Sequence, residues 1–147
     1  MVVSNNQLWM AFVADNDSRA ILVCSSLDGQ TWSDAVPAHG ESSKMAPALA
    51  IFNNQLWVAF VANNESNAVL ICSSPDGRTW SPNSPVGGQR SKTAPALAVA
   101  NNQLWVAFVA DNENDDVVMC ASPDGRRWSD NIPVRQRSQT APGLLSA

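Results

Sequence analysis

Apolar residues gather in a segment of about eight positions that occurs three times in the chain. In the middle copy, residues 55–62, the apolar side chains would lie on both faces of an extended strand. The segment is rich in β-branched and aromatic residues, and a pair of asparagines flanks it on each side. We therefore predict a β-strand that is covered on both sides, as in sheets stacked face to face.

The whole chain repeats with a fixed period. The pentapeptide Asn-Asn-Gln-Leu-Trp begins at Asn5, Asn53 and Asn101, which is a shift of 48 residues each time. Self-similarity of this kind is the sequence signature of a repeat architecture. We divide the single domain 1–147 into approximate repeats 1–46, 47–94 and 95–140, followed by one more copy of an inner strand at 141–147.

Each repeat is predicted to contain four strands. In the middle of the chain these are residues 55–62, residues 68–73, a short strand around 79–81 and, after a loop rich in Pro, Gly and Ser, the small apolar residues 94–100. Four-stranded units repeated in series are typical of β-propeller blades. The predicted fold class is all-β, with three four-stranded antiparallel blades per chain that close into a ring by homo-oligomerisation.

Three blades do not complete a propeller. Propellers usually have about four to eight blades, and an open arc exposes sheet edges and apolar faces. We expect the chain to associate with itself, as a twofold dimer with six blades. A trimer with nine blades is the less usual alternative. The strand at residues 141–147 is expected to complete the first blade of a neighbouring chain.

A turn of the form Ser-x-Asp-Gly-x-x-Trp occurs once in each repeat, within residues 25–32, 73–80 and 121–128. It resembles the Asp-box of sialidase-like β-propellers, although Asp and Gly are adjacent here and Arg127 replaces the usual threonine. The resemblance implies that the turn joins the third and fourth strands of a blade, away from the active site, and has a structural role. The residues concerned are Asp28, Trp32, Asp76, Trp80, Asp124 and Trp128.

The sequence predicts that the chain is not an enzyme. The resemblance implies that an active enzyme would need a tyrosine nucleophile and a cluster of arginines that binds the substrate carboxylate. The chain contains no tyrosine, and no position is arginine in all three repeats. A glycosidase that uses two carboxylates is the alternative, but no pair of carboxylates recurs or stands out. A catalytic thiol is disfavoured because His39, the only histidine, belongs to one repeat.

No cofactor or metal is predicted. Cys24, Cys72 and Cys120 lie one repeat apart, too far for a disulfide, and are interpreted as buried packing thiols on a strand. A metal site formed by these cysteines is the alternative. The acidic residues within 111–116 are interpreted as a solvated turn, in preference to a calcium loop.

Two sets of polar loops form the candidate ligand-binding surface, because amides, carboxylates and cations pair with sugar hydroxyls. In propellers the loop between the second and third strands shares a face with the linker between blades. The candidate residues are Asp15, Asn16, Asn63, Asn64, Asp111, Asn112, Lys44, Arg90, Lys92 and Arg137. Two alternatives remain open: the loops are simply solvated turns, or Trp9, Trp57 and Trp105 line a pocket between blades.

Charge and hydropathy narrow the range of partners. The net charge of −4 and the lack of a basic stripe argue against nucleic acid. No apolar run reaches the roughly 18 residues of a membrane span, and no signal peptide or other localisation signal occurs, so we expect a soluble chain. Two hypotheses follow: a self-assembling, lectin-like propeller that binds glycans, or an engineered or excised symmetric scaffold without a ligand.

Overall fold

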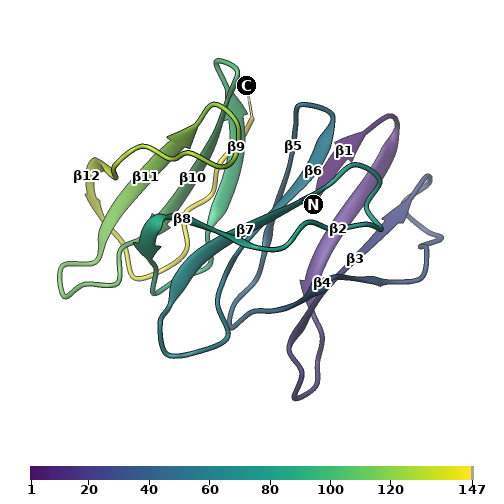
Figure 1. Cartoon of the computed structure of the whole chain (residues 1–147), viewed down its shortest axis with the longest axis horizontal. Coiled ribbons are helices and arrows are strands. Elements are labelled where there is room, and N and C mark those ends of the chain that lie inside the picture. The colour runs from purple at the N-terminus through teal and green to yellow at the C-terminus, as the bar shows by residue number, and fades with distance from the viewer. Residues whose placement is uncertain (147) are drawn as a thin grey trace.

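The computed structural model describes residues 1–146, which form three four-stranded antiparallel sheets standing side by side (Figure 1). We call these sheets blades 1, 2 and 3 in chain order. Blade 1 consists of β1 (Val2–Ser4), β2 (Gln7–Val13), β3 (Ala20–Ser26) and β4 (Val36–Ser42). Blade 2 consists of β5 (Ala48–Phe52), β6 (Gln55–Val61), β7 (Ala68–Ser74) and β8 (Ser84–Arg90). Blade 3 consists of β9 (Ala96–Ala100), β10 (Gln103–Val109), β11 (Asp116–Ser122) and β12 (Ile132–Arg137).

The predicted all-β class and the three antiparallel blades are confirmed. Strands follow one another across each sheet in chain order, so every connection within a blade joins neighbours. The first two strands of each blade are joined by the repeated asparagine pair; in blade 2, Asn53 and Asn54 have φ of 51° and 60°. A two-residue hairpin turn of the favoured type needs positive φ at both positions, and asparagine tolerates this conformation well.

The position of the fourth strand differs from the prediction. Residues 79–81 form no strand; they end the Asp-Gly turn, where the Ser81 amide donates to the Ser73 carbonyl at 2.8 Å. The fourth strand is β8, in the segment expected to be a loop because it contains Pro85, Gly87 and Gly88. Such residues are tolerated because β8 is an outermost strand, and its pairing with β7 shifts at a bulge.

The core consists of two apolar layers, one at each junction between neighbouring blades. Ile21 and Val23 of blade 1 pack with Val58 and Phe60 of blade 2. Trp57, Val69 and other residues on the opposite face of blade 2 pack against blade 3. Both faces of β6 are therefore covered, and every residue from 56 to 61 is at most 7% exposed, as the sequence predicts.

A tryptophan and a glycine meet at each junction. A Cβ built on Gly77 would lie 2.3 Å from the ring of Trp9, and one built on Gly125 would lie 2.2 Å from the ring of Trp57. The glycines belong to the Asp-Gly turn of the following blade and have φ of +78° and +79°. Glycine thus serves two needs here, a left-handed backbone and the close approach of an indole ring.

The outer faces of the first and last blades have no blade against them. On blade 1 this face carries Met10 and Phe12, and on blade 3 it carries Trp105 and Met119; all four are half-buried. Residues 141–146 form no strand in the single chain, and Leu144 and Leu145 lie over this face of blade 3. The expected pairing of this segment with a neighbouring chain stays a prediction. Residue 147 lies outside the described residues.

Within residues 1–146 there is no helix long and apolar enough to cross a membrane.

Candidate functional site

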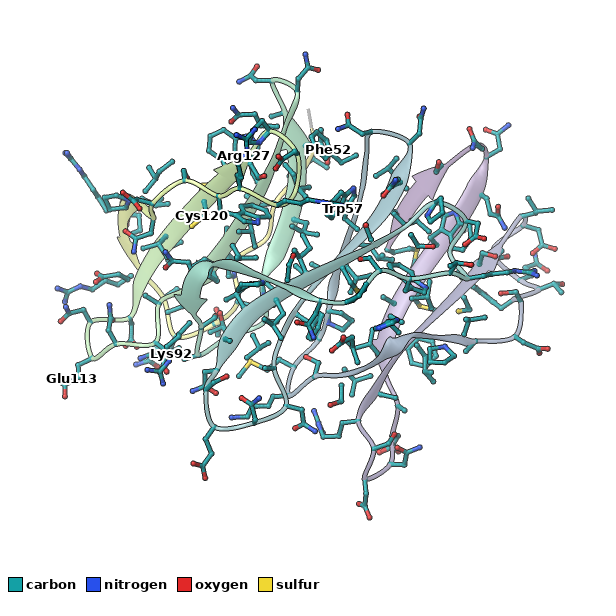
Figure 2. All side chains as sticks on the ribbon, viewed as in Figure 1. Phe52, Trp57, Lys92, Glu113, Cys120 and Arg127 are labelled. Atoms are coloured by element: carbon teal, nitrogen blue, oxygen red, sulfur yellow. The ribbon has the colours of Figure 1, made fainter. Side chains whose placement is uncertain are left out.

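The predicted polar loops do come together between blades. Lys44, in the linker after blade 1, donates from Nζ to the Asn67 Oδ1 of blade 2 at 2.8 Å. One junction later Lys92 makes the equivalent contact with Asp115, at 2.5 Å. Arg90 also pairs with Asp111, at 3.3 Å. Figure 2 labels Lys92 near this end of blade 3, with Glu113 extending beyond it.

These loop groups bind mainly to one another. The side-chain oxygens of Asn16, Asn64 and Asn112 each accept the backbone N–H two residues later at 2.9 Å, which fixes the shape of the loop. Asp15 and Asn63 lie on exposed loops, and Arg137 extends to 4.0 Å from Asp116. The arrangement is that of self-paired turns, and ligand contact at the ten predicted residues stays a prediction.

The Asp-Gly turn has the same hydrogen bonds in all three blades and lies between the third and fourth strands. In blade 2, Asp76 Oδ1 accepts the N–H groups of Arg78 and Thr79, each at 2.8 Å, and Ser74 Oγ accepts the N–H of Gly77 at 2.7 Å. Bonds to a carboxylate favour its charged form, so the backbone N–H groups of the turn lower the pKa of this carboxyl. The aspartates affected are Asp28, Asp76 and Asp124.

A cleft lies at a different place, beside Trp9, where blade 1 meets the Asp-Gly turn of blade 2. Its volume is about 660 Å³. A second hollow of about 540 Å³ shares Gln7 and Arg78 with it, so the two form one depression. The polar side chains around Trp9 are Gln7, Ser25, Ser33, Asp34, Asp76 and Arg78.

The chemistry of the Trp9 cleft is mixed. The half-buried indole offers a flat apolar surface, while Asp34 and Arg78 are exposed and present opposite charges. The Gln7 amide donates to Ser25 Oγ at 2.8 Å, which leaves its oxygen available to a ligand. An apolar wall with a few convergent polar groups is the usual composition of a small-molecule site.

The next junction is closed where the Trp9 cleft is open. Trp57, the equivalent of Trp9, is only 7% exposed and lies 6.3 Å from the Phe52 ring, centroid to centroid (Figure 2). Its indole N–H donates to the Phe52 carbonyl at 3.0 Å. In blade 1 the small Ser4 stands at the position of Phe52, and Asp34 stands at the position of Pro82. Sequence differences between repeats therefore explain why only one cleft carries these groups.

Sequence reasoning missed most of this site. It did suggest a pocket between blades beside the first tryptophans, and Trp9 lines such a cleft. Gln7, Asp34 and Arg78 were not singled out. A signal existed for Gln7, which precedes Trp9 by two residues and so points to the same face of β2. Asp34 and Arg78 come from turns of two different blades, whose approach no local pattern reveals.

The cysteines and the acidic run behave as structural groups. The three thiols are buried, and burial raises the pKa of each, to about 12 for Cys72 and about 11 for Cys120. Asp111, Asp115 and Asp116 each face a different basic side chain. In the described part of the chain, no three His, Cys, Asp or Glu residues gather closely enough to hold a metal ion.

Comparison with known proteins gives matches at the level of structure. No protein-family model matches the sequence, and no curated protein matches it. The chain is similar to an α-L-arabinanase from Penicillium chrysogenum, with a TM-score of 0.66 and 14% identity over 86% of this chain and 45% of the arabinanase. It is equally similar to an ulvan lyase, with a TM-score of 0.66 and 12% identity over 90% of this chain and 36% of the lyase. A β-fructofuranosidase from Bombyx mori matches with a TM-score of 0.62 and 11% identity, over 86% of this chain and 32% of the enzyme. The chain thus has a β-propeller fold found among carbohydrate-active enzymes, and spans less than half of these three proteins.

The prediction that the chain is not an enzyme is contradicted by these comparisons, because the similar structures are glycoside hydrolases and a lyase. The chain resembles part of the fold of these enzymes. The prediction rested on the absence of a tyrosine nucleophile and on the lack of a carboxylate pair that recurs between repeats, whereas the two carboxylates of a glycoside hydrolase need not recur. The chain has 13 Asp and Glu residues, so its lack of tyrosine excludes only the first chemistry.

Proposed function

We propose that the chain binds carbohydrate in the Trp9 cleft. The observation that carries the proposal is a half-buried indole in a cleft of about 660 Å³, flanked by the carboxylate of Asp34 and the guanidinium of Arg78. The fold similarity supports it, since the arabinanase structure holds arabinobiose and the ulvan lyase structure holds a saccharide of glucuronic acid and sulfated rhamnose. The class of ligand is an oligosaccharide.

Each side chain of the cleft has a role in this proposal. The apolar C–H face of a sugar ring packs on the indole of Trp9, which is amphipathic and has little side-chain entropy to lose. Gln7 and Asp34 accept hydrogen bonds from sugar hydroxyls. Arg78 binds a carboxylate or sulfate with two parallel N–H donors, so acidic sugars should bind more tightly than neutral ones.

A glycan screen followed by calorimetric titration tests the proposal. Replacing Arg78 with Ala should weaken binding of an acidic oligosaccharide by about 10- to 150-fold, because a hydrogen bond to a charged group is worth about 1.5–3 kcal/mol. Arg126→Ala is the matched control: it removes the equivalent arginine at the closed junction and should leave binding unchanged. Equal losses in both variants, or no binding to any glycan, would contradict the proposal.

The polar loops provide a second discriminating variant. Replacing Asn64 and Arg90 together with Ala removes two candidate ligand groups from the loop end without touching the Trp9 cleft. The proposal expects the double variant to bind as the original chain does. Loss of binding in that variant would instead place the ligand on the loops.

We also infer that the three Asp-Gly turns are Asp-box turns with a folding role. Three repeats of the same hydrogen bonds between an aspartate and its own backbone support this inference. So does the position of each turn after the third strand of a blade. Asp28→Asn, Asp76→Asn and Asp124→Asn should therefore lower thermal stability; three fully stable variants would contradict the inference.

A further inference from the structure

We propose that two copies of the chain associate head to tail into a six-bladed ring, in which the outer face of blade 3 of each copy packs on the outer face of blade 1 of the other. The argument rests on an interface that the chain already contains twice. The two junctions inside the chain show which residues must meet, and the free faces carry the two halves of a third junction.

A tryptophan lies against a glycine at each junction inside the chain. Trp9 lies on Gly77 and Trp57 lies on Gly125, so a third pair would consist of Trp105 and Gly29. Within residues 1–146 nothing covers Gly29 in this way: a Cβ built there meets only Leu8, at an ordinary 3.6 Å. Trp105 is half-buried and has only the C-terminal segment over it. Leu145 of that segment is 93% exposed, so the cover is poor.

The free apolar surface has the composition of the buried junctions. Phe12 on the outer face of blade 1 is the equivalent of Phe60 and Phe108, both of which are fully buried. Met10 and Leu22 lie on the same face and are half-buried. Burial of this apolar surface would stabilise the dimer. The surface that can cover it is the outer face of blade 3 of the other copy.

The charged loop residues that meet across a junction, which we call the junction rim, provide an independent argument. Arg90 pairs with Asp111 across the second junction. The residues at the same repeat positions on the free faces are Arg137 and Asp15, which also have opposite charges. Arg137 is 74% exposed and lies 4.0 Å from Asp116, so it is available to a partner.

The neighbouring rim position changes in a compensating way. Lys44 faces Asn67, and Lys92 faces Asp115. The repeat equivalents on the free faces are Gln139 and Arg19. A lysine in place of Gln139 would put two cations together, whereas glutamine can accept a hydrogen bond from arginine. The side chains of Gln139 and Arg19 are therefore compatible with each other, as the contact with a second copy requires.

Two copies give six blades, which is within the usual range of about four to eight, while three copies give nine. In a two-copy ring every blade face is covered, because the outer face of blade 3 of each copy meets the outer face of blade 1 of the other. A twofold axis relates these two junctions. The proposal does not depend on carbohydrate binding, since the Trp9 cleft is formed within one chain.

The test is the absolute mass in solution, by light scattering coupled to size-exclusion chromatography, with a charge exchange at the rim. The original chain should have about twice the mass of one 15.7 kDa chain. Asp15→Arg and Arg137→Glu should each shift the mass toward the single chain, because like charges then face each other. The double variant should restore the dimer. Asp17→Arg is the control: it makes the same charge change in the same loop and should leave the dimer intact.

Several outcomes would overturn the proposal. They are a single-chain mass for the original protein, a trimer or open polymers, or a dimer whose mass is indifferent to the two rim variants. Trp105→Ala is a second, independent variant that should also favour the single chain. Circular dichroism of each variant shows whether the blades remain folded, so that dissociation is distinguished from unfolding.

Discussion

Blades 1 and 2 have nearly the same second strand and very different surroundings. β2 reads Gln-Leu-Trp-Met-Ala-Phe-Val and β6 reads Gln-Leu-Trp-Val-Ala-Phe-Val. All seven residues of β2 are half-buried, whereas six of the seven in β6 are buried. The strand itself is therefore the same in both places, and its burial is decided by whether a neighbouring blade covers both faces. An arc of blades can have a well-packed middle and exposed ends even when its repeats are almost identical.

The largest expected effect separates Phe60 from Phe12. Phe60 is fully buried at the first junction, so Phe60→Ala should lower the free energy of unfolding by about 3–5 kcal/mol. Phe12→Ala should cost less in a single chain, because Phe12 is half-buried. If a second copy covers blade 1, the cost of Phe12→Ala grows with protein concentration while that of Phe60→Ala does not. Chemical denaturation at two concentrations measures both; equal costs at every concentration would contradict the comparison.

A smaller effect separates Gly77 from Gly29. Both have a left-handed backbone, with φ of +78° and +76°, so replacement by Ala causes similar backbone strain at each. Only the Cβ at Gly77 meets a tryptophan, at 2.3 Å. Gly77→Ala should therefore be less stable than Gly29→Ala by about 1–3 kcal/mol, the usual cost of overpacking.

The Gly77 measurement is best made in the Trp105→Ala background. That background removes the tryptophan expected to approach Gly29 from a second copy. In the original chain the difference between the two alanine variants should shrink, because both glycines would then face an indole. Thermal denaturation measures Gly77→Ala and Gly29→Ala, each in the original chain and in the Trp105→Ala background. A stability difference between the two alanine variants that is the same in both backgrounds would contradict the third junction.

The Asp-Gly turns give a pH-dependent test. Backbone N–H groups lower the pKa of Asp76 below its ordinary value in the folded chain. A group with a lowered folded pKa stabilises the fold above its unfolded pKa, and the stabilisation is lost as the pH falls through the folded value. Asp76→Asn should thus lower the melting temperature at pH 7 and make it less sensitive to acid below about pH 4. An unchanged acid profile would contradict this role.

The repeat pattern predicted much of the fold but not its boundaries. The apolar faces of residues 55–62 and the asparagine pairs were sufficient to place β6 and its hairpin, because both depend on local conformation. The fourth strand was misplaced, since its Pro85 and paired glycines are typical of a loop. They are compatible with a strand only because β8 lies at the edge of its sheet and forms a bulge.

The candidate site was harder to predict, for a physical reason. Trp9 and Gln7 share one strand, and their joint orientation follows from the two-residue period of a strand. Asp34 and Arg78 reach the cleft from turns in separate blades, so their proximity depends on how the blades stack. The polar loops were predicted as ligand groups because of their composition, which does not reveal that residues such as Lys92 and Asp115 bind each other.

The smallest expected effect comes from one residue at the rim, where the inner and outer junctions differ in charge. Gln139→Lys should weaken the dimer several-fold, because the new lysine would face Arg19 of the other copy. Adding Arg19→Asn should restore the dimer, since the two introduced side chains, a lysine and an asparagine, would reproduce the contact of Lys44 with Asn67. Analytical ultracentrifugation measures the dimer dissociation constant of each. Arg19→Asn alone is the control, and it measures what the loss of the arginine itself costs the dimer. A restored dimer would show that the free ends use the same register as the junctions inside the chain, whereas two additive losses would place Arg19 and Gln139 apart.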